Sequence, residues 1–277
     1  MSSAPPIDVV HLLAVLDKKL LELLRSLSAQ DWEKPTIAGK WRVKEVAAHL
    51  LDGNIRPLSM LRDQYTGEQP LNDPEETLIA FLNRLNADWV KAMQRVSPSI
   101  LIDLLEKTGP AYCQYYQSLD PYGVAGFPVI WAGEQESKNW MHIAREYSEK
   151  WIHQQQIRDA VKQPGLLTAA YFIPLMDTFL MALPYTYRNT DSSVNTRIQI
   201  NITGEVTGSW VLQKQHKDWQ IAKGIAAISD AQVSIPADIA WRLFSKSLRP
   251  HQVMDQVELS GDTSLGETAL HMVSVMA

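Results

Sequence analysis

Residues 189–203 read NTDSSVNTRIQINIT, and the chain changes character within this stretch. The first five residues, 189–193, are polar and are typical of a linker. From Arg197 to Thr203, isoleucines then alternate strictly with polar residues, which is the two-residue period of a half-buried strand. The change predicts a domain boundary near residue 190, with one domain at 1–190 and a second at 191–277.

The first domain is predicted to be all-α. Apolar residues recur at spacings of three and four from Ile7 to Leu27, which indicates an amphipathic helix. Pro74 and Pro98 are each placed to open a helix, because proline is favoured in a first turn. Further helices are expected at 41–62, 74–95, 97–119, 137–161 and 166–187.

The helix expected at 166–187 belongs to the most apolar window of the chain, Gly165–Tyr187. This window contains Asp177 and two prolines. A charge near the centre of a bilayer costs about 2.5–3.5 kcal/mol on insertion scales. We therefore expect a buried helix and no membrane span.

The second domain is predicted to be a small α+β unit. Short apolar segments with strand character follow Thr203, and Pro236 is placed to open a helix. The expected strands are 210–212, 219–222, 232–235 and 256–259, and a closing helix is expected at 264–272.

Composition narrows the class of protein. The 277 residues are 45% apolar and 21% charged, the balance of a globular chain with a real core. A net charge of −5 argues against non-specific nucleic-acid binding, which needs concentrated positive charge.

Cys113 is the single cysteine, so the chain forms no internal disulfide and no cysteine-rich zinc finger. With no secretory signal at 1–10, we expect a cytoplasmic location.

Thr108–Gly133 is rich in aromatic residues, and Asp120 is its only charge. Glycines and prolines, beginning with Gly109 and Pro110, are predicted to break it into loops. Such a segment can line an apolar pocket, with Tyr116 and Trp131 as candidate substrate-binding residues, or simply pack its rings on the helices. Its aromatic residues are Tyr112, Tyr115, Tyr116, Tyr122, Phe127 and Trp131.

Glu149 and His153 are four residues apart on the helix expected at 137–161, so they project from one side. His49 lies at the rim of the apolar face of the 41–62 helix. Two imidazoles and one carboxylate could form a three-ligand metal site with open positions. His142 and Glu146 share the stripe of Glu149 and His153, so they are rival ligands. The whole stripe could instead be a solvated face with a weak ion pair.

Four motifs taken together indicate a family. They read WRVKEVAAHL at 41–50, EKWIHQQQIRDA at 149–160, DAQVSI at 230–235 and VELSGD at 257–262. The combination resembles the DinB-like metal-dependent hydrolase superfamily, and within it the mycothiol-dependent maleylpyruvate isomerase branch. The second half resembles the sterol-carrier-like domain that follows the bundle in that branch.

The resemblance implies a four-helix bundle with an added terminal helix. It also implies that His49, Glu149 and His153 bind a divalent metal, with zinc first and nickel as the alternative. In that branch the metal activates a low-molecular-weight thiol or a water. In the isomerase the thiolate adds to a conjugated double bond, the bond rotates and the thiol leaves. Arg84 and Arg242 are the candidates for binding carboxylates of a small-molecule substrate.

Two other functions remain open from the sequence. A hydrolase with an activated water would use the same three ligands and differ only in the nucleophile. A non-catalytic protein that binds a small molecule or a lipid would keep the fold without turnover, because a fold does not fix a function.

Overall fold

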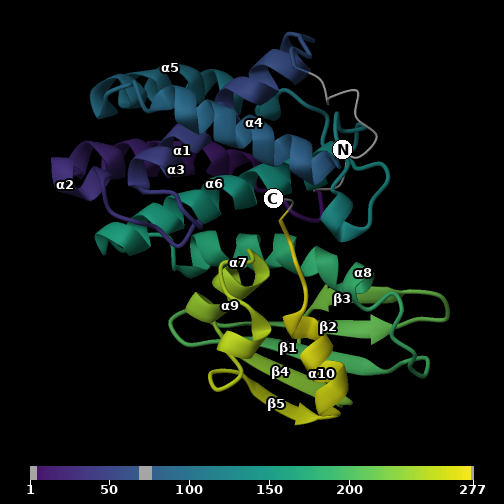
Figure 1. Cartoon of the computed structure of the whole chain (residues 1–277). Coiled ribbons are helices and arrows are strands. Elements are labelled where there is room, and N and C mark those ends of the chain that lie inside the picture. The colour runs from purple at the N-terminus through teal and green to yellow at the C-terminus, as the bar shows by residue number, and fades with distance from the viewer. Residues whose placement is uncertain (1–4, 69–76, 276–277) are drawn as a thin grey trace. The chain divides into compact units, whose positions relative to one another are not determined.

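The computed structural model describes residues 5–68 and 77–275, and it divides into two compact units (Figure 1). The first unit contains residues 5–126 and 138–164, and the second contains Phe127–Ser137 and Gly165–Val275. The predicted boundary near residue 190 marks the change from helix to strand, whereas the compact units divide at Pro164 and Gly165. The expected helix start at Pro74 lies outside the described residues.

The first unit is a bundle of long helices. Helices α1 (Val10–Ser26) and α3 (Val43–Pro57) each contact both α5 (Pro98–Gln117) and α6 (Asn139–Val161), while α4 (Leu78–Met93) packs on α3. The helical prediction for this part is confirmed. A one-turn helix, α2 (Ala29–Trp32), lies between α1 and α3, and a π-helical segment, η1 (Leu58–Arg62), extends α3.

Local capping sets where the helices begin, and so which side chains reach the interior. The Arg42 amide donates to Glu45 Oε2 at 2.7 Å, which fixes the first turn of α3. The Ser97 hydroxyl accepts from the Ile100 amide at 3.3 Å, with Pro98 in the first turn of α5. The apolar sides of these helices form a continuous core, made largely by α1, α3 and α5.

The helix expected at 97–119 is confirmed as α5, and the loop prediction for the start of the aromatic segment is wrong. Helix α5 continues to Gln117 through Gly109 and Pro110, so three of its tyrosines are helical. An interior proline removes one backbone hydrogen bond, but the packing of α5 on α1 and α3 keeps the helix intact. Gly109 serves close packing, because a Cβ there would lie 2.1 Å from Asp17 Oδ2.

The single helix expected at 166–187 is interrupted. It consists of α7 (Ala169–Phe179), a 3-10 turn η3 (Leu180–Ala182) and α8 (Leu183–Thr186). Pro184 has no amide to bond the carbonyl four residues earlier, which accounts for the break. Among the described residues, no helix is both long and apolar enough to cross a bilayer.

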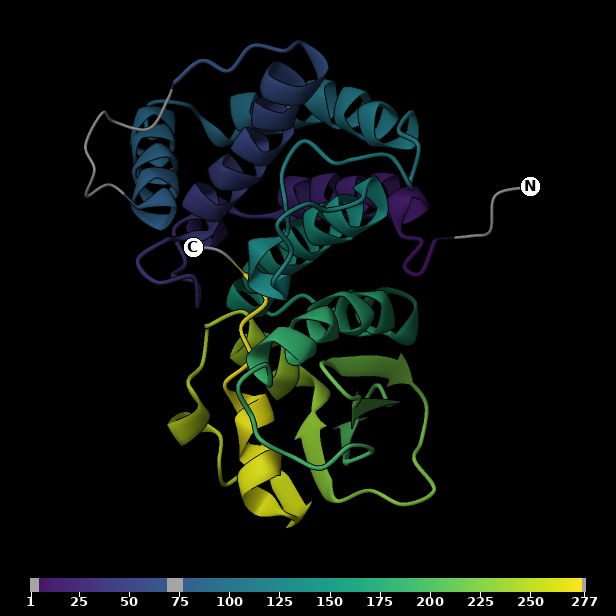
Figure 2. The ribbon, with the colours of Figure 1, turned by 90° about the vertical axis from the view of Figure 1, so that its right-hand side faces the viewer.

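The second unit is built on a five-stranded sheet of order β3-β2-β1-β4-β5 (Figure 1), in which β1 and β4 are the one pair of neighbouring described strands that runs parallel. Figure 2 shows this unit after a quarter turn. Helices α8, α9 and α10 pack on the sheet, and Asp177 of α7 accepts hydrogen bonds from Trp210 of β2 and Lys223 of β3. The prediction of an α+β unit is confirmed, and the isoleucines of the alternating strand are buried as expected. The elements are β1 (Arg197–Thr203), β2 (Gly208–Lys214), β3 (Trp219–Lys223), β4 (Ala231–Pro236), α9 (Ala237–Phe244), β5 (Glu258–Gly261) and α10 (Thr263–Leu270).

Candidate functional site

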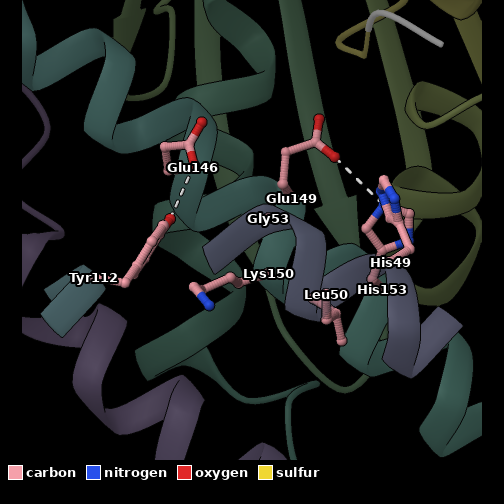
Figure 3. Close-up of a pocket in the computed structure, with 8 residues that line it drawn as sticks. All are labelled: His49, Leu50, Gly53, Tyr112, Glu146, Glu149, Lys150 and His153. Atoms are coloured by element: carbon pink, nitrogen blue, oxygen red, sulfur yellow. Dashed lines mark hydrogen bonds and ion pairs between the residues drawn. The ribbon is translucent and has the colours of Figure 1, made fainter. Parts of the chain in front are cut away.

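Three side chains, one of them about a hundred residues before the other two, meet between α3 and α6. His49 comes from α3, whereas Glu149 and His153 come from α6, and one potential ligand atom of each lies within 4.8 Å of the other two (Figure 3). His153 Nε2 is 3.4 Å from Glu149 Oε2. Two imidazole nitrogens and one carboxylate oxygen form a donor set that suits a zinc or nickel ion with open positions.

The His153 ring is held by a second contact. Its Nδ1 lies 2.8 Å from Oε1 of Gln156, one turn further along α6. An amide oxygen can only accept, so Nδ1 is the donor in this contact, and Nε2 is the ring nitrogen on the side of Glu149. Metal-binding histidines characteristically donate their other N–H in this way.

His49 is held without such a partner. Its Nδ1 is buried and makes no hydrogen bond with any residue that the structure describes. Its ring centroid is 4.9 Å from that of Trp41 and 4.6 Å from that of His153. Burial, together with the charges of His153 and Arg56, lowers the pKa of His49 well below the usual value. The imidazole is therefore neutral at pH 7, as a metal ligand must be.

A small cavity of about 30 Å³ lies beside these three residues. Its volume suits about two water molecules. Besides the three, it is lined by Leu50 and Gly53 of α3, Tyr112 of α5, and Glu146 and Lys150 of α6.

The lining residue Lys150 is a buried cation. Its Nζ donates to Asn54 Oδ1 at 2.6 Å, lies 3.8 Å from Asp17 Oδ1 and is 4.2 Å from the centroid of the Tyr112 ring. Burial lowers the pKa of Lys150, and the Asp17 carboxylate opposes that shift. Burial likewise raises the pKa of Asp17, and Lys150 opposes it.

Glu146 faces a different set of partners. Tyr112 donates its hydroxyl to Glu146 Oε2 at 2.9 Å, Arg145 donates to Oε1 at 2.8 Å, and His142 Nε2 is 3.5 Å away. Burial alone would raise the pKa of Glu146, but the His142 hydrogen bond and the Arg145 charge hold it well below its usual value.

These contacts revise one interpretation of the α6 stripe. His142 is 2% exposed and Glu146 is 9% exposed, so they do not lie on a solvated face. As many as 17 of the 23 residues of α6 are buried. His142 and Glu146 are engaged with Arg145 and Tyr112, whereas Glu149 and His153 are the pair that meets His49.

The other predicted site residues lie elsewhere. Tyr116 is buried on α5 with its ring 4.8 Å from that of Tyr112, and Arg84 on α4 pairs with Glu68. Arg242 on α9 pairs with Asp238 at 3.3 Å, and Trp131 is buried in the second unit. None of the four lines the described cavity, and their role in substrate binding stays a prediction.

The sequence analysis did not point to three residues at the site, namely Gly53, Lys150 and Gln156, whereas Tyr112 belongs to the aromatic segment expected to line a pocket. Gln156 had a local signal, since it is three residues from His153 and so on the same side of the helix. Lys150 had a weaker one, because it lies four residues after Glu146. Gly53 carried no signal beyond being a glycine inside a helix.

Comparison with known proteins identifies the family. The model of the mycothiol maleylpyruvate isomerase N-terminal domain matches residues 13–158, a span that contains His49, Glu149 and His153. The chain belongs to this family. The resemblance noted in the sequence is thereby confirmed.

Solved structures related to this isomerase family agree in fold. The crystal structure of mycothiol-dependent maleylpyruvate isomerase matches with a TM-score of 0.55 and 11% identity, covering 94% of this chain and 96% of that chain. The structure of a histidine-to-alanine mutant of that enzyme matches with a TM-score of 0.54 and 11% identity over the same shares. The predicted two-part architecture is therefore shared over nearly the whole length.

Two further comparisons complete the result. Sterol carrier protein 2-like 2 from Aedes aegypti matches 30% of this chain and 80% of that chain, with 18% identity and a TM-score of 0.25. No curated protein sequence matches the chain.

Proposed function

We propose that this chain is a metal-dependent enzyme in which a divalent ion activates a low-molecular-weight thiol for isomerisation or thiol transfer. The proposal is supported by His49, Glu149 and His153, whose potential ligand atoms lie within 4.8 Å of one another. All three residues are inside the span that matches the isomerase family. Zinc is the first candidate for the ion and nickel the second, because this nitrogen and oxygen donor set suits both.

The residues present fit such an ion. His49 offers a neutral imidazole with a buried, unpaired nitrogen, and His153 offers Nε2 with its ring fixed by Gln156. The Glu149 side chain is 37% exposed, so the site is reachable from solvent. An ion held by three protein ligands keeps positions for a thiol, and a thiol bound to it loses its proton near neutral pH and becomes a nucleophile.

The reaction we propose balances without any further reactant. The thiolate adds to one carbon of a conjugated cis double bond, which leaves a single bond that can rotate. After rotation the carbon–sulfur bond breaks and the trans double bond forms. The thiol is regenerated, so it acts as a cosubstrate that is not consumed.

The test is a turnover assay with the reconstituted protein. Zinc- and nickel-loaded samples are mixed with maleylpyruvate and, in separate arms, with mycothiol, glutathione or cysteine, and the trans product is followed by chromatography. We expect metal- and thiol-dependent isomerisation, which the His153→Ala variant lacks. Metal-loaded protein that isomerises with none of the thiols would refute the thiol mechanism. Hydrolysis of ester or amide substrates by the same sample would then favour an activated water.

A further inference from the structure

Gly53 has no structural reason to be a glycine. It lies inside α3 with ordinary helical backbone, and a Cβ built on it would meet no atom of the described residues within 4 Å. Glycine lowers the stability of a helix interior relative to alanine. Gly53 is exposed and also lines the cavity, so it lies where solvent and the cavity meet, and a side chain there would narrow the opening.

Lys150 lies at the other side of the same cavity. It is 6% exposed, and an ammonium group has three N–H donors. Among the described residues, Asn54 accepts one of them at 2.6 Å. Asp17 is 3.8 Å away, too far for a hydrogen bond, and the Tyr112 ring presents its face rather than a lone pair. Donors of a buried cation are thus left for a ligand in the cavity.

The two carboxylates that line the cavity, those of Glu146 and Glu149, do not pair with the Lys150 ammonium group. The Glu146 carboxylate accepts hydrogen bonds from Arg145 at 2.8 Å and from the Tyr112 hydroxyl at 2.9 Å. Glu149 lies with the two histidines of the metal site. Lys150 keeps its ion pair with Asp17 at 3.8 Å, and a small anion that enters the cavity would meet the remaining N–H donors of the Lys150 ammonium group on one side and the proposed metal ligands on the other.

We propose that Lys150 binds a carboxylate of the substrate in this cavity and that Gly53 keeps the entry open. The inference rests on the proposed function and adds to it a residue that selects anionic substrates. The cavity volume of about 30 Å³ suits one carboxylate group rather than a whole organic acid. The rest of the substrate then stays near the metal side, where a thiol can reach it.

The experiment measures binding without turnover. Maleate, a dicarboxylate, is titrated into zinc-loaded protein by calorimetry, and zinc content is measured on each sample. We expect Lys150→Met to weaken maleate binding by about tenfold or more with zinc content unchanged, since a charge-assisted bond is lost. Lys91→Met, which removes an exposed lysine on α4, is the control for net charge and should bind as the parent does.

Two further variants keep the test decisive. Lys150→Met leaves the Asp17 carboxylate buried without its cation. If this single variant does not fold, the Asp17→Asn/Lys150→Met double variant, which removes both charges, is measured in its place. Gly53→Ala should weaken maleate binding while the melting temperature holds or rises. Parent-like maleate affinity in a folded Lys150 variant, or in Gly53→Ala, would overturn the inference.

The outcomes separate this inference from the proposed function. Maleate binding that depends on Lys150, in a protein that isomerises with no thiol, would support the carboxylate site and refute only the reaction. Thiol-dependent isomerisation with an unchanged KM in the folded Lys150 variant would support the reaction and refute the carboxylate site.

Discussion

His153 Nδ1 and Gln156 Oε1 are 2.8 Å apart, one turn of α6 from each other. The contact makes Nδ1 a hydrogen-bond donor and fixes the ring so that Nε2 lies 3.4 Å from Glu149 Oε2. A residue that touches no ligand atom therefore decides how the imidazole is presented.

Replacing Gln156 should change metal affinity while the ligands stay in place. We expect Gln156→Leu to weaken zinc binding by about 10–100-fold, the usual effect of losing such an outer partner. Competition with a chromophoric chelator measures the affinity. The matched control is Gln155→Leu, a neighbouring buried glutamine that bonds Asp159 at 2.7 Å. Equal zinc affinity in both variants would show that the Gln156 contact does not position His153.

Removing a ligand should remove the metal. His153→Ala is expected to stay folded and to hold well under one zinc per chain, because two remaining ligands bind too weakly to survive dialysis. His142→Ala and Glu146→Gln should keep the full zinc content, since both residues contact Arg145 instead. Circular dichroism checks folding. If Glu146→Gln loses zinc, the site lies one turn earlier on α6.

Two helical glycines give a paired test of stability. Gly109→Ala places a Cβ 2.1 Å from Asp17 Oδ2, so we expect a loss of about 1–3 kcal/mol in the free energy of unfolding, as for an overpacked core. Gly53→Ala meets no atom and should gain about 0.5–1 kcal/mol. Urea unfolding of both variants measures the difference. Equal effects would mean that Asp17 moves freely away from α5.

Cys113 should react only at high pH. Burial raises the pKa of its thiol to about 11, with Asp17 adding to the rise and Lys150 opposing it. A raised pKa means less thiolate at any given pH, so at pH 8 the thiolate fraction is about a hundredfold below that of an ordinary thiol.

The rate of iodoacetamide alkylation at pH 8, compared between folded and urea-unfolded protein, checks the expectation for Cys113. The folded chain should react at least about a hundredfold more slowly, because its 5% exposure adds to the effect of the pKa. A folded-state rate close to the unfolded one would contradict the burial of Cys113 on α5.

Much of the fold was predictable because its signals are local. The alternation of Ile198, Ile200 and Ile202 gives a strand, and Ser97-Pro98 gives a helix start. Gly109 and Pro110 misled the loop prediction, because the packing of α5 on α1 and α3 comes from residues distant in sequence.

The convergence of the three proposed metal ligands was predictable from the spacing of Glu149 and His153 on α6 and from the family motifs. The remainder of the site was not, because its chemistry depends on long-range partners. Lys150 would be expected on a surface, and it is buried with Asn54 and Asp17, which come from α3 and α1. Nothing in the neighbourhood of Lys150 in the sequence indicates these partners.

Whether His49, Glu149 and His153 hold a divalent metal is decided by elemental analysis of untagged protein, purified without chelator and compared with His153→Ala. We expect about one zinc or nickel ion per chain in the parent protein and little in the variant. A parent protein that contains no divalent ion, and takes up neither zinc nor nickel when they are added, would contradict this expectation.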